Sequence, residues 1–186
     1  MSRIIVFGGT FDPVHVGHLA LAEFAKEETG AACVLLIPAG QNPLREAPGA
    51  TFDQRLAMLR LATADQDIVV DPREGARPGP SYTVDTLEEL HAELARPLWL
   101  LLGGDQLAGF RHWRRWERIL ELAELLVVNR PGCPAPTDAV PHRSLEWPGM
   151  ELSASWLRAR LAAGHRCRHL LPCGVGEYIE EEGLYR

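Results

Sequence analysis

The chain has 186 residues, 46% of them hydrophobic, and its 19 basic and 25 acidic side chains leave a formal net charge of −6. This length and composition suit one globular domain over 1–186 with a full hydrophobic core. The acidic balance argues against broad binding to nucleic acid or an anionic membrane surface. The apolar runs are too short to span a membrane and no leader-like segment precedes the first strand, so we expect a cytoplasmic protein.

Short apolar runs alternate with helical patterns along the chain. Runs bounded by glycine, proline or polar residues predict buried strands at 4–7, 33–37, 68–70, 98–102 and 125–128. Apolar residues at helical spacing predict helices at 19–30, 51–64, 84–94, 117–122, 153–164 and a last short helix up to Gly183. Thr51 and Gln54 form a capping-box pattern. This alternation predicts an α/β fold: a Rossmann-like, doubly wound parallel sheet of five to six strands with helices on both faces.

A glycine turn joins the first predicted strand to the first helix, over Gly8-Gly9-Thr10-Phe11-Asp12-Pro13-Val14-His15-Val16-Gly17-His18. Two glycines without a Cβ atom let a bulky anion approach the backbone, and the helix start offers unpaired N–H groups. The two histidines add side-chain donors, so the segment predicts a phosphate site. An ordinary structural turn is the alternative. A metal site is disfavoured because His-x-x-His lacks the glutamate and the spacing of the helical zinc motif.

Three polar loops follow predicted strands. They are the glycine turn at 8–18, the segment 41–45 after the second strand, and Gly103-Gly104-Asp105 after the fourth. In open parallel sheets the ligand lies at the carboxyl ends of the strands, so we expect these loops to share one rim and one site.

Several blocks together carry a family resemblance. Besides the glycine turn they are 79–86 (Gly-Pro-Ser-Tyr-Thr-Val-Asp-Thr), Gly104-Asp105 followed by Trp113, 129–132 (Asn-Arg-Pro-Gly), 153–158 (Ser-Ala-Ser-Trp-Leu-Arg) and 181–185 (Glu-Glu-Gly-Leu-Tyr). The turn resembles that of the nucleotidyltransferases with a His-x-Gly-His motif. The full set, from residue 4 to the end of the chain, resembles the bacterial nicotinate-nucleotide adenylyltransferases.

This resemblance implies an enzyme of NAD biosynthesis that binds ATP and nicotinate mononucleotide side by side. The 5′-phosphate of the mononucleotide would attack the α-phosphorus of ATP directly, giving deamido-NAD and pyrophosphate, with Mg²⁺ entering on ATP and no dedicated metal ligands in the protein. Two alternatives stay open: another acceptor, namely nicotinamide mononucleotide or phosphopantetheine, and a nucleotide sensor without chemistry. The oligomeric state is open, a homo-oligomer included.

The same resemblance assigns roles to residues. The catalytic set is His15, His18 and Arg158. The ATP-binding set is Gly8, Gly9, Thr10, Phe11, Gly104, Asp105, Arg130, Ser153 and Ser155, with the C-terminal helices at 153–183 completing the phosphate site. The mononucleotide-binding set is Arg45, Thr83 and Trp113, the last as an aromatic face for the nicotinate ring. Trp116 is expected in the core.

Some positions depart from the family pattern, and a few side chains stay outside it. Ala154 replaces a serine, Ser155 replaces a threonine and Leu44 replaces a histidine, so one hydroxyl and one titratable donor of the family pattern are missing. The cysteines have no Cys-x-x-Cys spacing, and we expect reduced thiols. Zinc binding by a short cluster is a less favoured alternative to an ordinary loop; the cluster is His165, Cys167, His169 and Cys173.

Overall fold

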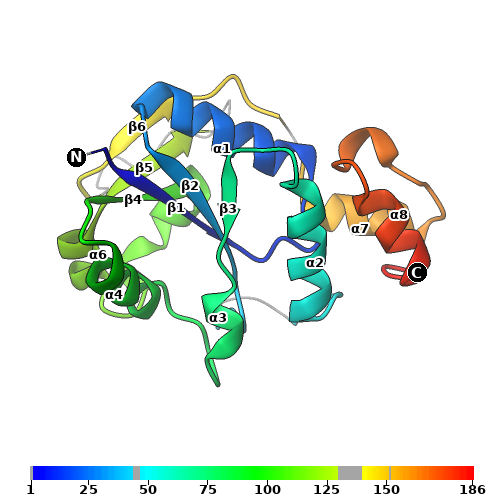
Figure 1. Ribbon diagram of the computed structural model, residues 1–186, viewed down its shortest axis with the longest axis horizontal. Coiled ribbons are helices and arrows are strands. Elements are labelled where there is room, and N and C mark those ends of the chain that lie inside the picture. Colours follow the sequence, from blue (N-terminus) through cyan, green and yellow to red (C-terminus); the bar gives the residue numbers. More distant parts are fainter. Residues whose placement is uncertain (1, 44–46, 130–139, 151) are drawn as a thin grey trace.

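The computed structural model describes residues 2–43, 47–129, 140–150 and 152–186. Its centre is a parallel sheet of six strands in the order β3-β2-β1-β4-β5-β6 (Figure 1). The strands are β1 Ile4–Gly9, β2 Cys33–Pro38, β3 Ile68–Val70, β4 Leu98–Gly103, β5 Ala123–Asn129 and β6 Arg143–Glu146. The direction of winding reverses between β1 and β4, which is where doubly wound sheets bind ligands.

The expected strands are confirmed, and the sixth strand, β6, is the one whose position the sequence did not reveal. β6 reads Arg-Ser-Leu-Glu, and only Leu145 among its residues is buried. An edge strand with one buried side chain has no apolar run, so hydrophobic patterning gives no signal for it.

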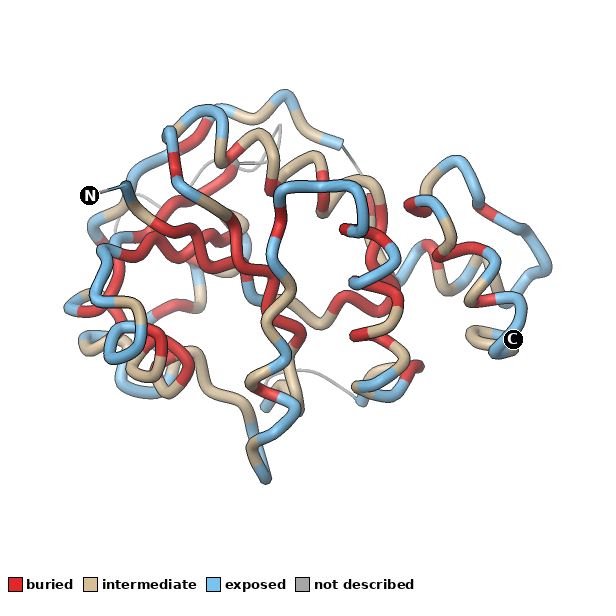
Figure 2. Tube along the Cα trace, viewed as in Figure 1, coloured by how far each residue is buried: buried red, intermediate tan, exposed pale blue. Residues whose placement is uncertain are grey.

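Alternate residues of each strand point to opposite faces of the sheet, and each face has its own helices. On one face, Ile5 and Phe7 of β1 and the strand residues that point the same way pack with α1 (Val16–Thr29) and α2 (Phe52–Ala62). Ile4 and its alternates pack with α4 (Thr83–Leu94) and α6 (Trp116–Leu122), which lie together on the other side in Figure 1. Because both faces are covered, the central strands β2, β1 and β4 are buried along most of their length (Figure 2), as expected of a parallel sheet, whereas the edge strands β3 and β6 are more exposed.

Short helices occupy some of the predicted loops. α3 (Arg73–Ala76) precedes α4, and α5 (Gly104–Ala108) follows β4 directly. Two single turns of 3₁₀ helix, Phe110–His112 and Arg168–Leu170, complete the connections. Helices this short carry no hydrophobic periodicity that could reveal them in a sequence.

Two C-terminal helices, α7 (Ala154–Ala162) and α8 (Val175–Glu181), lie beyond α2 at one side of the molecule (Figure 1). Their apolar side chains, among them Leu157 and Ile179, belong to the same core cluster as α1 and α2. The end of the chain is therefore packed onto the half of the molecule that carries the glycine turn. Within the described ranges, no helix is both long and apolar enough to cross a membrane.

Candidate active site

The glycine turn leaves β1 at the carboxyl edge of the sheet and is shaped by one buried aromatic ring. Phe11 has a positive φ of 49° and is 2% exposed. A Cβ atom on Gly9 would lie 2.8 Å from the Phe11 ring, whereas one on Gly8 would meet nothing within 4 Å. Gly9 therefore makes room for the ring, and Gly8 leaves its backbone open to a ligand. Phe11 could contact ATP only through its main chain, because its side chain lies beneath the turn.

The two histidines of the turn lie against each other at the start of α1. His15 is the N-cap residue and is 4% exposed, and its ring stacks on that of His18 with the centroids 3.6 Å apart. The main-chain N–H of His15 donates to Nδ1 of His18 at 3.2 Å. An Nδ1 atom that accepts must be unprotonated, so a neutral His18 carries its proton on Nε2. This hydrogen bond, rather than the ring stack, makes Nε2 the donor atom of a neutral His18.

Asp12 lies at the centre of the turn and joins four parts of the chain. Its buried carboxylate accepts hydrogen bonds from the main-chain N–H groups of Gly49 (2.8 Å) and Ala50 (3.1 Å) and from the hydroxyl of Tyr185 (2.6 Å). Arg158 of α7 donates to the main-chain oxygen of Asp12 at 2.7 Å and also lies 3.5 Å from its carboxylate. Burial, and then the hydrogen bond to Asp12, raise the pKa of the Tyr185 hydroxyl above its usual value.

α7 brings Arg158 to this turn, and the predicted serine ligands lie at the start of the same helix. Arg158 keeps 37% of its side-chain surface exposed, so part of its guanidinium is open to a ligand. Ser153 is the N-cap of the helix and accepts from the N–H of Trp156 at 3.3 Å, and its hydroxyl lies 3.3 Å from that of Ser155. Capping occupies the Ser153 hydroxyl as an acceptor and leaves its proton for another partner.

The predicted ribose ligands follow β4 and begin α5. Gly104 is buried and Asp105 is exposed. A Cβ atom on Gly103 would lie 2.5 Å from the Asp105 carboxylate, so the preceding glycine is needed for this carboxylate to fold back over the strand end. β4 pairs directly with β1 in parallel, so Gly104 and Asp105 follow their strand at the same edge of the sheet as the turn after β1.

The predicted acceptor residues lie on the other sheet face, at the start of α4 and before α6. Thr83 is the first residue of α4, and Trp113 packs partly buried against Phe110, with ring centroids 5.4 Å apart. The two segments are in contact, because the guanidinium of Arg114 lies over the ring of Tyr82, 4.5 Å from its centroid. Thr83 directly follows Tyr82 in the chain and Trp113 directly precedes Arg114, so this contact brings the two predicted acceptor residues near each other. Trp116 is only partly buried, packed against the core rather than inside it.

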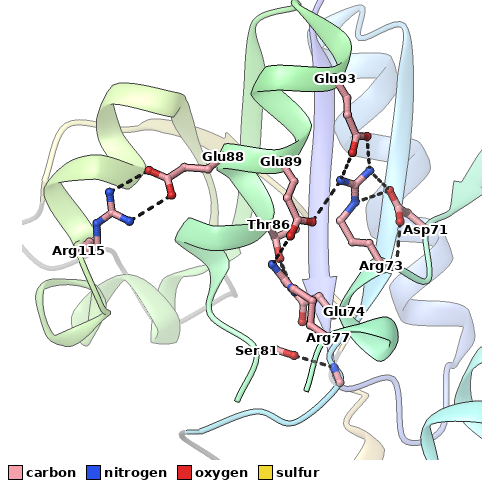
Figure 3. Close-up of polar contacts among 11 residues, drawn as sticks. Asp71, Arg73, Glu74, Arg77, Ser81, Thr86, Glu88, Glu89, Glu93 and Arg115 are labelled. Atoms are coloured by element: carbon pink, nitrogen blue, oxygen red, sulfur yellow. Dashed lines mark hydrogen bonds and ion pairs between the residues drawn. The ribbon is translucent and has the colours of Figure 1, made fainter. Parts of the chain in front are cut away.

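A network of charges fixes the start of α4 (Figure 3). Thr86 donates to the buried carboxylate of Glu74 at 2.7 Å and accepts from Arg77, which also pairs with Glu89 at 3.1 Å. On the other side of α4, Glu88 accepts two hydrogen bonds from Arg115, at 2.8 and 3.1 Å, which tie α4 to the segment before α6. These contacts hold the segment that directly follows Trp113 against the helix that begins at Thr83.

Some predicted residues lie outside the described part of the chain, and others are not brought together. Arg45, Leu44, Arg130 and Cys133 lie outside the described residues. In the zinc alternative, Cys167 is buried in the core whereas its three potential partners are exposed. Among the residues that the structure describes, no three His, Cys, Asp or Glu side chains lie close enough to hold a metal ion.

Three residues of the site were not identified from the sequence: Asp12 as a centre of contacts, Tyr185 as its partner, and Arg55 beneath the turn. An aspartate followed by proline is typical of a turn, so nothing in the sequence suggested that the Asp12 carboxylate also binds distant parts of the chain. Arg55 is 1% exposed. The only sequence feature that could have indicated the burial of Arg55 is its place directly before Leu56, among the residues of α2 that face the core.

A doubly wound parallel sheet with a phosphate-type turn at its switch point is the architecture of a nucleotide-binding α/β protein. The chain belongs to the cytidylyltransferase-like family, whose sequence profile matches residues 6–169. Proteins named probable nicotinate-nucleotide adenylyltransferase from Stenotrophomonas maltophilia and Roseiflexus are both 45% identical to it, over 100% of this chain and 98% of theirs. A solved structure of Plasmodium falciparum nicotinic acid mononucleotide adenylyltransferase complexed with NaAD has the same fold, with a TM-score of 0.79 at 16% identity, covering 100% of this chain and 98% of that one.

Proposed function

We propose that the protein is a nicotinate-nucleotide adenylyltransferase, which transfers the AMP moiety of ATP to nicotinate mononucleotide and forms deamido-NAD and pyrophosphate in NAD biosynthesis. The names of its full-length relatives support this substrate pair. The structural observation that carries the proposal is the contact of Arg158 with the turn that holds His15 and His18. This contact joins residues from the two ends of the chain, and we assign phosphate binding to all three side chains.

The reaction follows from this arrangement. The N–H groups at the start of α1, the Nε2 proton of His18 and the guanidinium of Arg158 would hold the ATP phosphates and neutralise the charge that develops on them. A 5′-phosphate oxygen of the mononucleotide attacks the α-phosphorus, and the bond from that phosphorus to the bridging oxygen of pyrophosphate breaks. No protein nucleophile is required, because alignment and charge neutralisation suffice for phosphoryl transfer.

Magnesium fits this scheme as a partner of ATP rather than as a resident metal. The carboxylate beside the turn, Asp12, is already engaged by Tyr185 and by two main-chain N–H groups. Mg²⁺ commonly binds through substrate phosphates and keeps several waters. We therefore assign its ligands to the oxygen atoms of ATP and derive no step from a protein metal site.

The remaining roles are part of the same proposal. Ser153 and Ser155 bind the outer phosphates, so that the helices at 153–183 complete the ATP site of a single domain. On the ATP side the backbone of 8–11 lies along the phosphates, Gly104 and Asp105 bind the ribose, and Arg130 lies near the adenine. On the acceptor side Thr83 and Trp113 bind the nicotinate moiety and Arg45 binds the phosphate. ATP and nicotinate mononucleotide are the partners, and the cytoplasm is the site of action.

A side-by-side assay tests the proposal. The purified protein is incubated with ATP, Mg²⁺ and one of three acceptors: nicotinate mononucleotide, nicotinamide mononucleotide or phosphopantetheine. We expect pyrophosphate and deamido-NAD with the highest kcat/KM for the first. Preference for another acceptor would overturn the substrate assignment. Tight ATP binding with no pyrophosphate from any acceptor would instead identify a nucleotide sensor.

A further inference from the structure

Arg55 of α2 lies beneath the sheet edge and joins two loops that belong to different halves of the proposed site. Its Nη1 atom donates to the main-chain oxygen of Thr10 at 2.8 Å, in the turn after β1. Its Nη2 atom donates to the main-chain oxygen of Ala39 at 2.8 Å and to that of Gly40 at 3.4 Å, in the loop after β2. One guanidinium therefore holds both loops by their carbonyl groups.

Burying the charge of this arginine costs free energy of folding, so we ask what the residue contributes in return. The residue is 1% exposed, burial lowers the pKa of its guanidinium, and its Nε atom has no hydrogen-bond partner among the described residues. Its hydrogen bonds within the described chain go to neutral carbonyl groups, and the negative charges of Asp12 and Glu74 offset only part of the cost of burial, so the pKa stays lowered. What the planar fork does supply is a fixed distance between two acceptors, which the single ammonium of a lysine cannot reproduce.

The loop after β2 is also held by Ser81, which lies before α4 (Figure 3). The Ser81 hydroxyl accepts from the N–H groups of Gly40 at 3.2 Å and Gln41 at 3.3 Å, and the Ser81 N–H donates to the Gln41 oxygen at 2.8 Å. A Cβ atom on Gly40 would lie 2.4 Å from the Glu74 main-chain oxygen, so the loop packs tightly here. Ser81 thus joins this loop to the start of α4, where Thr83 lies.

We propose that Arg55 is a positioning residue that sets the ATP loop and the acceptor loop relative to each other, while Ser81 positions the acceptor loop alone. This inference rests on the proposed function, in which the turn after β1 binds ATP, while Thr83 and Arg45, which follows the Ala39–Gln41 segment in the sequence, bind the mononucleotide. In-line attack requires the two phosphates to meet at a defined distance, and displacement by about 1 Å costs on the order of 10²-fold in rate. The link between the loops is therefore part of the catalytic alignment.

Three variants test the proposal by steady-state kinetics. Arg55→Lys keeps the charge but loses the fork, and we expect it to raise KM for both ATP and nicotinate mononucleotide and to lower kcat by roughly 10-fold or more. Ser81→Ala should raise KM for the mononucleotide and leave that for ATP near the wild-type value. Arg60→Lys, an exposed position on the same helix, is the matched control and should change neither. A purely structural role of Arg55 would lower the folded fraction, and hence kcat, with both KM values unchanged, and that result would overturn the proposal.

A titration of the wild-type protein decides the question even if Arg55→Lys does not fold or no product forms. The ¹⁵N–¹H signal of Arg55 Nε is followed by NMR as a non-hydrolysable ATP analogue or nicotinate mononucleotide is added separately. Because the guanidinium contacts both loops, we expect each ligand alone to shift this signal. A signal that moves with one ligand only, or with neither, contradicts the proposal. Absence of product from the wild-type enzyme with ATP and the mononucleotide, by contrast, counts against the proposed function.

Discussion

Arg158 donates from Nη1 to the main-chain oxygen of Asp12 at 2.7 Å, although 146 residues separate them in the chain. Through this contact α7 and the turn after β1 form one surface, with part of the guanidinium left exposed. Helix propensity and hydrophobic spacing predict α7 but not its distance from the turn, because that distance depends on how α7 and α8 pack against the core.

The first prediction concerns this guanidinium. Arg158→Lys should lower kcat/KM for ATP by about 10²-fold, since lysine retains the charge but cannot bind Asp12 and phosphate with one planar fork. Pyrophosphate release under varied ATP measures the effect. Arg160→Lys on the same helix, whose guanidinium lies over Trp156, should remain close to wild type. An equal loss of kcat/KM in both variants would show that any substitution on α7 lowers activity, and would contradict a specific role of Arg158.

Much of the fold was predictable because buried parallel strands have continuous apolar runs that the sequence displays directly. The features that the sequence did not predict have one property in common. Their structure depends on contacts with residues that are distant in the chain. β6 has one buried residue, and Tyr185 and Arg55 take on their roles only when the strands and helices are in place. Their partners are main-chain atoms and a carboxylate far away in sequence, which spacing cannot reveal.

The same distinction applies to the candidate site. The sequence predicts a phosphate site from glycines and histidines that are neighbours in the chain, and the structure places the rings of His15 and His18 in direct contact. The side-chain position of Phe11 was not predicted, because its burial depends on a positive φ and on a neighbouring glycine. Residue types close together in the sequence can suggest a kind of site, but the direction of each side chain depends on the folded backbone.

A matched pair of glycine substitutions separates folding from ligand approach. Gly9→Ala should lower the free energy of unfolding by about 1–3 kcal/mol, because its Cβ would press on the Phe11 ring. Gly8→Ala should leave stability near wild type, since its Cβ meets nothing, but should raise KM for ATP by occupying the open side of the turn. Urea denaturation and steady-state kinetics on both proteins give the comparison. A wild-type KM for ATP in the Gly8→Ala enzyme would contradict the proposal that the ATP phosphates bind along this backbone.

His18→Ala tests charge stabilisation at the α-phosphate. The variant loses the Nε2 donor, so kcat should fall by ~10²- to 10⁴-fold. The His15 N–H loses its partner as well, which should cost only about 1 kcal/mol of stability. His91→Ala, at an exposed position of α4, serves as the control. Near-normal pyrophosphate release by a well-folded His18→Ala protein would exclude the proposed role.

Trp113→Ala tests the aromatic face of the acceptor site. Stacking of a nucleotide base on an aromatic side chain is worth about 1–3 kcal/mol, so KM for nicotinate mononucleotide should rise by roughly 10-fold or more while KM for ATP stays unchanged. Trp113→Phe should recover most of the loss. Trp147→Phe, which packs with Phe24 on the opposite sheet face, controls for general effects on the core. A rise in KM for ATP instead would place Trp113 on the other half of the site.

The last prediction concerns the hydroxyl of Tyr185, which donates to the buried Asp12 carboxylate at 2.6 Å. Tyr185→Phe should lower the free energy of unfolding by about 2 kcal/mol at neutral pH, the range for a hydrogen bond to a charged group. The pKa of this hydroxyl is raised in the folded protein, so its contribution is fully present below the unfolded pKa of about 10 and is lost as the pH rises from there toward the folded pKa. The difference between wild type and Tyr185→Phe, measured by urea denaturation from pH 7 to 11, should therefore be constant up to about pH 10 and shrink above it. A Tyr185→Phe difference that grows with pH would contradict the assigned hydrogen bond.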